Sequence, residues 1–497
     1  MPEGNLTYHY YSTGKVESIQ SSNANGVNVS YTYDGLNRLS TVVDNRLSSN
    51  NTTSYTYDNA SNVALITYPN MTQDSFTYDP LNRLTAMNSG TASYSYQLGL
   101  TGNRTQATES TGRTLNWSYD GIYRLTNEAI SSDPEQVNGS VAYGLDPVGN
   151  RLTQGSSITG LNSGSFGYNA DDEVSTETYD NNGNTLTTGG KTFAYDSENH
   201  VTSMTQGSTV VTIKYDAFGN RVSKTVNGVT TQYLVDNLNP TGYSQVLDEL
   251  SGTTAARTYT YGLQRISEDQ IVNSAWVLSF YGYDGAESVR QLTNSMGQIT
   301  DSFEYDAFGN KINSTGATPN NYLYRGEQYD PDLGLYYLRA RYMNPATGRF
   351  LSRDPEDGIT NDPASLHKYI YAGGDPVNAY DPTGRSAGAA VRGGSGEEYL
   401  GLIAAVVIAV QYSANNAGRN SSSVVSSVRM LGENLNCSYH RTACMLTGLA
   451  SKRGGKWGQR RCDMCYEACI RNEGIWPTDI RTTGRPLDCE YSLYPSE

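Results

Sequence analysis

Residues 31–39 read Tyr-Thr-Tyr-Asp-Gly-Leu-Asn-Arg-Leu, and residues 76–84 repeat this unit as Phe-Thr-Tyr-Asp-Pro-Leu-Asn-Arg-Leu. More degenerate copies follow about every two dozen residues through the first two thirds of the chain. The last clear copy is Phe-Glu-Tyr-Asp-Ala-Phe-Gly-Asn-Lys at residues 303–311. Repetition at a fixed period indicates one supersecondary unit stacked on copies of itself, so this part of the chain is predicted to be a repeat array.

Each unit is predicted to be roughly one β-hairpin. Phe303 and Tyr305 lie two residues apart with the charged Glu304 between them, which is the period of a strand with one packed and one wet face. Asp306 then ends the strand, and Gly309-Asn310 tolerates the positive φ angles that reverse the chain. The predicted fold class is therefore mainly β.

Tyrosine dominates the aromatic residues, with 40 Tyr against 8 Phe. A tyrosine ring can pack while its hydroxyl stays hydrated, so this bias indicates a sheet with much interfacial surface. Only 37% of the residues are hydrophobic and the mean hydropathy is −0.55, too little for an apolar core in proportion to 497 residues. A sheet wound around a hydrated hollow would reconcile these observations.

Four stretches late in the array resemble a known family. They read Tyr-Gly-Tyr-Asp-Gly-Ala-Glu-Ser-Val-Arg-Gln-Leu-Thr (281–293), Tyr-Arg-Gly-Glu-Gln-Tyr-Asp (324–330), Gly-Leu-Tyr-Tyr-Leu-Arg-Ala-Arg-Tyr (334–342) and Asn-Pro-Ala-Thr-Gly-Arg-Phe-Leu-Ser-Arg-Asp-Pro (344–355). With the repeats, they resemble the tyrosine-aspartate (YD) repeats and the repeat-associated core of bacterial Rhs proteins, of the C component of Tc toxins and of teneurin shells. The resemblance covers residues 1–385. It implies that the hairpins spiral into a hollow shell and that the core closes one end of it.

Four regions are predicted along the chain. They are a YD-repeat shell (1–279), which is N-terminally incomplete because the array begins in mid-unit, the core (280–385), a Gly/Ala linker with a short apolar segment (386–430), and a small α-rich, cysteine-containing C-terminal domain (431–497). The 11 apolar residues 400–410 span about 17 Å as a helix, against roughly 30 Å for a bilayer core. Both a buried helix of the C-terminal domain and a membrane-inserting segment remain open.

The net charge of −15 is unevenly distributed. Residues 386–497 hold 12 Lys/Arg and 10 Asp/Glu, whereas residues 1–385 hold 23 and 40. An acidic shell is not expected to contact nucleic acid, whose phosphates attract basic surfaces. The shell could instead retain the weakly basic C-terminal region, or its charge could serve solubility alone. The resemblance implies a secreted or cell-surface protein. Because the first residues show no basic start and no apolar run, we expect a route other than a Sec signal peptide.

Among the Asp-Pro pairs near the end of the shell region are residues 354–355 and 381–382. Neighbouring carboxyls can divide the base and acid roles of a hydrolysis. The resemblance implies that Asp354 and Asp381 form the dyad of an autoprotease, that Arg353 shapes its site, and that the cleavage position is Arg385. The family has leucine where this chain has Arg385, and Asp-Pro also forms simple turns, so a purely structural role stays open.

All 6 cysteines lie in the last quarter of the chain, and an even number in a small domain of an exported protein favours disulfides. Two pairs have a spacing of seven residues, which puts each pair on one face of a helix. Two antiparallel helices would then link Cys437 to Cys469 and Cys444 to Cys462, with Cys465 left for Cys489. The alternatives are a zinc site formed by Cys437, His440, Cys462 and Cys465, or a reactive thiol.

The C-terminal domain has no recognisable catalytic signature, and His440 is its only histidine. The basic residues 452–461, with Trp457 among them, suit a contact with RNA or membrane phosphates, or a solvated loop. No cofactor is predicted. The resemblance implies a shell that encloses and carries its own C-terminal effector, a polymorphic toxin used against bacteria or a host, with a cognate immunity protein and delivery machinery as partners. The alternative is a secreted or cell-surface YD-repeat protein with a structural, adhesive or carbohydrate-binding role.

Overall fold

The computed structural model describes residues 3–49, 51–90, 92–358, 363–385, 388–389, 479–481 and 486–488. The chain divides into two compact units, Met1–Glu397 and Glu398–Glu497. In the second unit, the described residues form one hairpin of β36 (Asp479–Arg481) and β37 (Pro486–Asp488). The helices predicted for residues 431–497 lie outside the described residues.

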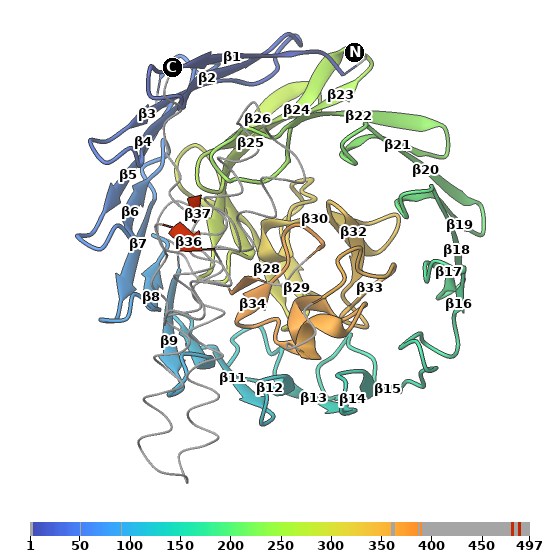
Figure 1. Cartoon of the computed structure of the whole chain (residues 1–497). Coiled ribbons are helices and arrows are strands. Elements are labelled where there is room, and N and C mark those ends of the chain that lie inside the picture. The colour runs from blue at the N-terminus through green and yellow to red at the C-terminus, as the bar shows by residue number, and fades with distance from the viewer. Residues whose placement is uncertain are drawn as a thin grey trace. The chain divides into compact units, whose positions relative to one another are not determined.

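The first unit begins with a 15-stranded sheet in which each strand pairs antiparallel with the next one along the chain (Figure 1). Its strands are β1 (Leu6–Tyr10), β2 (Val16–Ser21), β3 (Asn28–Tyr33), β4 (Leu39–Asp44), β5 (Thr52–Tyr57), β6 (Val63–Thr67), β7 (Gln73–Tyr78), β8 (Leu84–Asn88), β9 (Ser93–Leu98), β10 (Arg104–Glu109), β11 (Thr114–Tyr119), β12 (Leu125–Ser131), β13 (Gly139–Leu145), β14 (Arg151–Ser156) and β15 (Gly164–Ser165).

A second sheet of 14 strands continues the same antiparallel order. Its strands are β16 (Thr178–Tyr179), β17 (Thr185–Thr188), β18 (Lys191–Tyr195), β19 (Val201–Gln206), β20 (Thr209–Tyr215), β21 (Arg221–Val226), β22 (Val229–Asp236), β23 (Gln245–Ser251), β24 (Thr254–Tyr261), β25 (Arg265–Val272), β26 (Ala275–Tyr283), β27 (Val289–Thr293), β28 (Ile299–Tyr305) and β29 (Lys311–Thr315).

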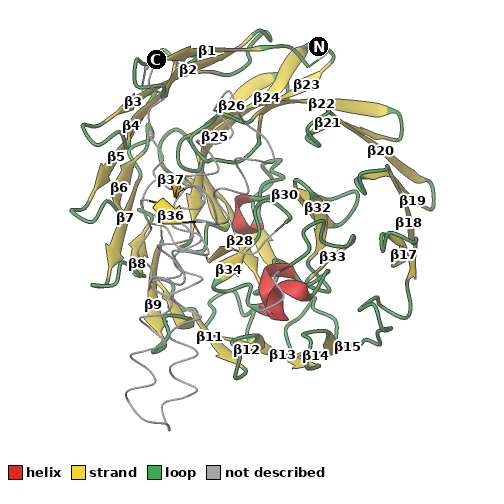
Figure 2. Ribbon diagram, in the orientation of Figure 1, coloured by secondary structure: helices red, strands yellow, loops and turns green. Residues whose placement is uncertain are grey.

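Residues 322–385, which we call the end segment, contain short elements and little regular sheet. They are the 3-10 helices η1 (Tyr324–Gly326), η2 (Pro363–Leu366) and η3 (Tyr371–Gly374), the four-stranded sheet β30 (Gln328–Asp330), β31 (Leu335–Leu338), β32 (Arg341–Asn344) and β33 (Arg349–Phe350), and β34 (Ala379–Tyr380), which pairs with β35 (Gly388–Ala389). Strands and loops make up nearly all of the described chain (Figure 2), so the predicted mainly β class is confirmed.

The aspartate of each unit organises its turn locally. Asp79 Oδ1 accepts the backbone N–H groups of Leu81 and Arg83 at 2.9 and 3.0 Å, and Asp79 Oδ2 accepts Arg83 Nε at 2.7 Å. The same pattern surrounds Asp34 and Asp120. Most repeats therefore have Asp at one position and Arg or Asn four residues later, although His200 and Ser288 take the second position in two of them.

The tyrosine of each unit ends its strand and bonds to the preceding unit. In β3 the pairing register shifts between Thr32 and Tyr33, and the Tyr33 hydroxyl donates to the Val16 carbonyl at 2.9 Å. The same bond joins Tyr57 to Leu39, Tyr78 to Val63, Tyr119 to Arg104, Tyr215 to Val201, Tyr283 to Arg265 and Tyr305 to Val289. The excess of tyrosine over phenylalanine thus has a different cause from the one expected, because these hydroxyls bond the neighbouring repeat instead of water.

The second sheet packs back onto the first, so the strip of hairpins is wound on itself. Tyr8 in β1 donates to Asp236 at 2.7 Å across 228 residues, and a parallel bridge joins residues 24 and 254. Farther along both sheets, Arg290 pairs with Glu109 at 2.9 Å, and Glu128 Oε2 accepts the Ala307 N–H at 2.7 Å. One winding therefore takes roughly 180–230 residues, and the contact between windings contains many buried polar groups.

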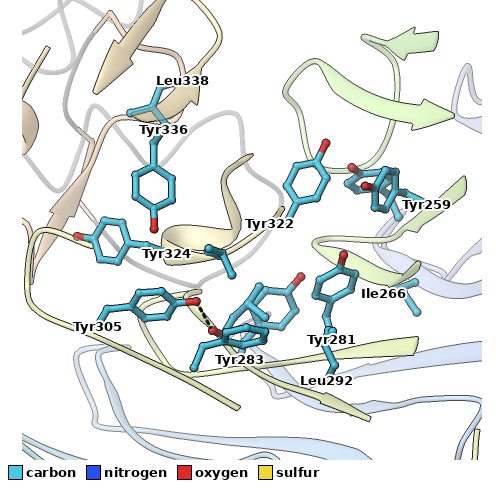
Figure 3. Close-up of a cluster of buried hydrophobic side chains, with 14 of the residues drawn as sticks. Tyr259, Ile266, Tyr281, Tyr283, Leu292, Tyr305, Tyr322, Tyr324, Tyr336 and Leu338 are labelled. Carbon is cyan, nitrogen blue, oxygen red and sulfur yellow. Dashed lines mark hydrogen bonds between the residues drawn. The ribbon is translucent and has the colours of Figure 1, made fainter. Parts of the chain in front are cut away.

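Tyrosines form much of the packed core, in place of the Phe, Leu and Ile that a more apolar chain would use. Figure 3 shows rings from β24, β26, β28, η1 and β31 gathered in one cluster. Tyr259, Tyr281 and Tyr336 are each at most 2% exposed. A second cluster joins β18–β20 to the end segment through residues such as Phe193, Met204 and Leu335. The hydroxyls of the three tyrosines donate to Glu249, Glu268 and the Gly309 carbonyl at 2.9, 3.0 and 3.0 Å, which lets tyrosine take the place of Phe or Leu here.

Candidate functional site

Arginines anchor the end segment to distant repeats. Arg221 in β21 pairs with Asp330 in β30 at 3.1 Å, and both side chains are 1% exposed. Arg349 in β33 donates to Asn150 Oδ1 at 2.8 Å across 199 residues. These contacts hold the short strands β30 and β33 against the repeats.

Asp354 and Asp381 come together on one arginine. Arg341 Nη2 lies 2.7 Å from Asp354 Oδ2 and 3.3 Å from Asp381 Oδ2. The side chains of Arg341 and Asp381 are 3% and 2% exposed, and that of Asp354 is 17% exposed. Two carboxylates held by one cation can approach each other without full repulsion, which is the arrangement that paired acid and base chemistry needs.

The same arginine reaches the backbone next to the expected cleavage position. Arg341 Nε donates to the Gly384 carbonyl, and its guanidinium lies 3.6 Å from the centre of the Phe350 ring. The Arg385 N–H donates to Asp381 Oδ1 at 3.1 Å. One carboxylate of the pair therefore contacts the residue at which the chain is expected to be cut.

Burial sets the protonation of this group. Desolvation raises the pKa of the Asp354 carboxyl, and the nearby Arg341 opposes that shift. Burial likewise lowers the pKa of the Arg341 guanidinium, while the two carboxylates oppose the change. An arginine stays charged at neutral pH, so Arg341 remains a cation. A raised carboxyl pKa helps one member of the pair to hold a proton that it can donate.

Arg353 contacts a different part of the shell. Its side chain packs along Gly183, in the turn between β16 and β17, and its charge acts on Tyr369. Arg385 pairs with Glu356 at 3.3 Å, with both side chains more than half exposed. The arginine that touches both carboxylates is Arg341, which sequence reasoning did not select. Its signal was the motif at residues 334–342, which was read only as a mark of resemblance.

The other predicted site residues cannot be placed. The six cysteines, His440 and the basic residues 452–461 all lie outside the described residues, as does the apolar segment 400–410. Within the described ranges, no three His, Cys, Asp or Glu side chains are grouped so that they could hold a metal ion. No helix in this part of the chain has the length and apolar character needed to span a membrane.

The profile of the Teneurin YD-shell family matches residues 140–377. Those residues contain the whole second sheet and most of the end segment, with Arg341 and Asp354. The chain is an Rhs/YD-repeat shell protein. This confirms the resemblance that was inferred from the repeats and the four late motifs.

Relatives of this YD-repeat shell protein include a tRNA nuclease and a toxin protein. A tRNA nuclease WapA of Bacillus subtilis strain 168 is 30% identical over 366 residues, which is 62% of this chain and 15% of that protein. The toxin protein Tse5 of Pseudomonas aeruginosa is 44% identical over 69 residues, 14% of this chain and 5% of its own. The YD-repeat chain thus spans a small part of the length of these relatives.

Solved structures show the same fold. The TcdB2-TccC3 complex with Cdc42 superposes with a TM-score of 0.62 at 17% identity and covers 76% of this chain and 21% of that one. The Tc holotoxin pore of Photorhabdus luminescens gives a TM-score of 0.60 at 16% identity and covers 78% and 22%. At this level of identity, the shared feature is the wound YD-repeat sheet.

Proposed function

We propose that this chain forms a toxin-carrying shell, which encloses an effector formed by residues 431–497 and cuts itself at Arg385. The observation that best supports this is the placement of Asp354 and Asp381 on Arg341, with Asp381 bonded to the Arg385 N–H. Relatives whose names describe a toxin and a tRNA nuclease support the carrier role. The predicted regions 1–279, 280–385, 386–430 and 431–497 are part of this proposal.

The cut would proceed by water attack on the Arg385 carbonyl carbon. The ionised carboxyl of the pair takes a proton from the water, and the protonated one gives its proton to the nitrogen of Ser386 as the peptide bond breaks. Arg341 holds the Gly384 carbonyl and so keeps the neighbouring peptide in place. Its positive charge also stabilises the carboxylate that remains ionised.

A denaturing gel of the purified chain tests the cut. The expected result is a fragment that ends at residue 385, with only the intact band in Asp354→Asn. An intact wild-type band that persists for days, with no shorter species by mass spectrometry, would rule out self-cleavage. Arg353→Gln is the matched variant, because this neighbouring arginine contacts Gly183 rather than the carboxylates.

Expression of residues 386–497 tests the effector separately. Growth arrest in the bacterial cytoplasm or periplasm, rescued by an immunity protein encoded downstream, is expected for a toxin. In the same sample, the mass after alkylation without reductant shows whether the cysteines form disulfides, for which we propose Cys437–Cys469, Cys444–Cys462 and Cys465–Cys489, or are free to bind zinc, for which the ligands would be Cys437, His440, Cys462 and Cys465. If none of the six cysteines is alkylated, all are in disulfides. If all six are alkylated, disulfides are excluded.

A surface role is the second candidate. The Salivary gland surface protein 1 of Aedes aegypti is 31% identical to this chain over 104 residues, 20% of this chain and 3% of that protein. Harmless expression of residues 386–497 in both compartments, together with an uncut chain, would favour this structural or adhesive role. In either case, secretion or display at the cell surface is part of the proposal, and its route is left open.

A further inference from the structure

Residues 376–385, which we call the strap, lie across three arginines that bind its backbone. Arg325 Nη2 donates to the carbonyls of Pro376, Val377 and Ala379, the last two at 3.2 Å. Arg339 Nη1 donates to the Pro382 carbonyl, and Arg341 Nε to the Gly384 carbonyl. Five carbonyls of one short segment are thus bound by charged donors, which make stronger hydrogen bonds than neutral ones.

Two of these arginines are also held by groups outside the strap. Arg325 Nη1 donates to the Ala286 carbonyl at 2.8 Å, and Arg325 is 6% exposed. Arg339 Nη1 lies 3.0 and 3.1 Å from the two oxygens of Glu327, and its Nε donates to the Ser244 carbonyl at 2.9 Å. The donors that face the strap are therefore held in place by partners that do not belong to it.

The backbone of the same two arginines is strained. Arg325 has φ +56° and Arg339 has φ +61°, a left-handed conformation that residues other than glycine rarely adopt. Such strain persists only where the surroundings fix it, and it gathers at binding and catalytic sites. Here it places both guanidinium groups along the path of the strap.

Close backbone contact completes the site at the end of the strap. The Ala340 N–H donates to the Thr383 carbonyl at 3.2 Å, next to the carbonyl that Arg341 binds. Gly384 has φ +68°, and a Cβ there would collide with backbone atoms of Leu338 and Arg341. The bonds to the carbonyls of residues 376, 377, 379 and 382 do not depend on the side chains there, whereas position 384 requires glycine, so the site recognises mainly the backbone path of the segment.

We propose that Arg325, Arg339 and Arg341 form a peptide-binding track that holds the backbone of residues 376–385 and thereby presents Arg385 to Asp354 and Asp381. The second half of this statement rests on the proposed self-cleavage. The hydrogen bonds of Arg325 and Arg339 go to the strap and to the shell, not to Asp354 or Asp381, so both are positioning residues.

Hydrogen exchange of the full-length chain tests the track without any cleavage. In Arg325→Gln and in Arg339→Gln, amides of residues 376–385 are expected to exchange at least about tenfold faster than in the wild type, because the strap loses its charged partners. Arg349→Gln is the matched control, since this buried arginine on β33 binds Asn150 and Asp172 rather than the strap. If Arg325→Gln does not fold, Arg339→Gln decides the test, with Arg339→Lys expected to restore protection in part.

The rate of self-cleavage, followed on denaturing gels, separates this proposal from the cut itself. Presentation by the track is supported if Arg339→Gln cleaves more slowly than the wild type at an unchanged unfolding midpoint. Arg339→Lys should then cleave faster than Arg339→Gln. If the wild-type chain never cleaves but the two Gln variants still show faster exchange of the strap amides, the binding site is upheld and the proposed self-cleavage is refuted. Unchanged exchange in both Gln variants, or equal deprotection in Arg349→Gln, would overturn the track.

Discussion

The repeats and the end segment use charge in opposite ways. In the repeat turn at Asp79, every partner of the carboxylate lies within four residues. In the end segment, Arg341 joins groups 13 and 43 residues away, and Arg349 reaches across 199 residues. A local network can be copied along the chain with each repeat, whereas a long-range one forms only once the windings are in place.

Removal of the shared cation should break the end segment more than any change in a repeat. Arg341→Gln leaves Asp354 and Asp381 without their buried partner and is expected to lower the free energy of unfolding by about 3–5 kcal/mol. Urea unfolding measures the loss. Arg353→Gln, a change of an exposed arginine close by, should stay within about 0.5 kcal/mol. Similar losses in the two variants would contradict the assigned role of Arg341.

The contact between the windings is expected to depend on pH. Burial, with a smaller effect of Asp306, raises the pKa of Glu128 from 4.5 to about 7, and burial raises that of Asp306 from 3.8 to about 6. A carboxyl with a raised pKa binds more protons in the folded chain than in the unfolded one. Its contribution to stability is therefore present at low pH and is lost as the pH rises from 4.5 to about 7.

Glu128→Gln should reduce this pH dependence. The drop in unfolding free energy between pH 5 and pH 8 is expected to shrink by roughly 2–3 kcal/mol, because the uncharged side chain no longer titrates. Denaturant unfolding at both pH values measures it. The exposed Glu198→Gln serves as control and should leave the slope as it is. A slope unaffected by Glu128→Gln would show that the two windings are not coupled through this residue.

A single repeat turn should lose less and should act alone. Asp79→Ala removes the acceptor for two N–H groups and is expected to cost about 1–2 kcal/mol in unfolding free energy. Asp146→Ala removes the same kind of acceptor two hairpins or more away. The double variant should equal the sum of the single variants within about 0.5 kcal/mol. A clear departure from additivity would contradict the local character of the repeats.

The bond between successive repeats should give the smallest effect. Tyr57→Phe removes one hydroxyl donor to the Leu39 carbonyl and is expected to cost about 0.5–1.5 kcal/mol. Thermal unfolding compared with Tyr10→Phe, at a half-exposed tyrosine, measures the difference. Equal midpoints would show that tyrosine is used at Tyr57 for its ring alone.

The hairpin was predictable because its determinants are close together in the sequence. The strand that ends at Tyr305, the turn at Asp306 and the positive φ of Gly309 all occur where the repeat places them. The role of the tyrosine hydroxyl was not predictable in this way. Its acceptor lies one repeat back, and only the pairing register decides which carbonyl it meets.

The candidate site likewise contains residues that the sequence could predict and one that it could not. Asp354 and Asp381 could be selected because their Asp-Pro motifs match the family pattern, and the structure brings them onto one guanidinium. Arg341 could not be selected, because the sequence around it does not distinguish it from Arg339, which lies two residues earlier. The difference between them is made by the segments that return to each one.

By itself, the sequence determined the repeat, the hairpin, the Asp-centred turn and the family, since each depends on residues a few positions apart. Only the tertiary structure decided that the second sheet packs on the first, that tyrosine hydroxyls join the repeats, and that Arg325, Arg339 and Arg341 line up under residues 376–385. These contacts join groups brought together by winding the strip, and periodicity along the chain carries no record of which groups those will be.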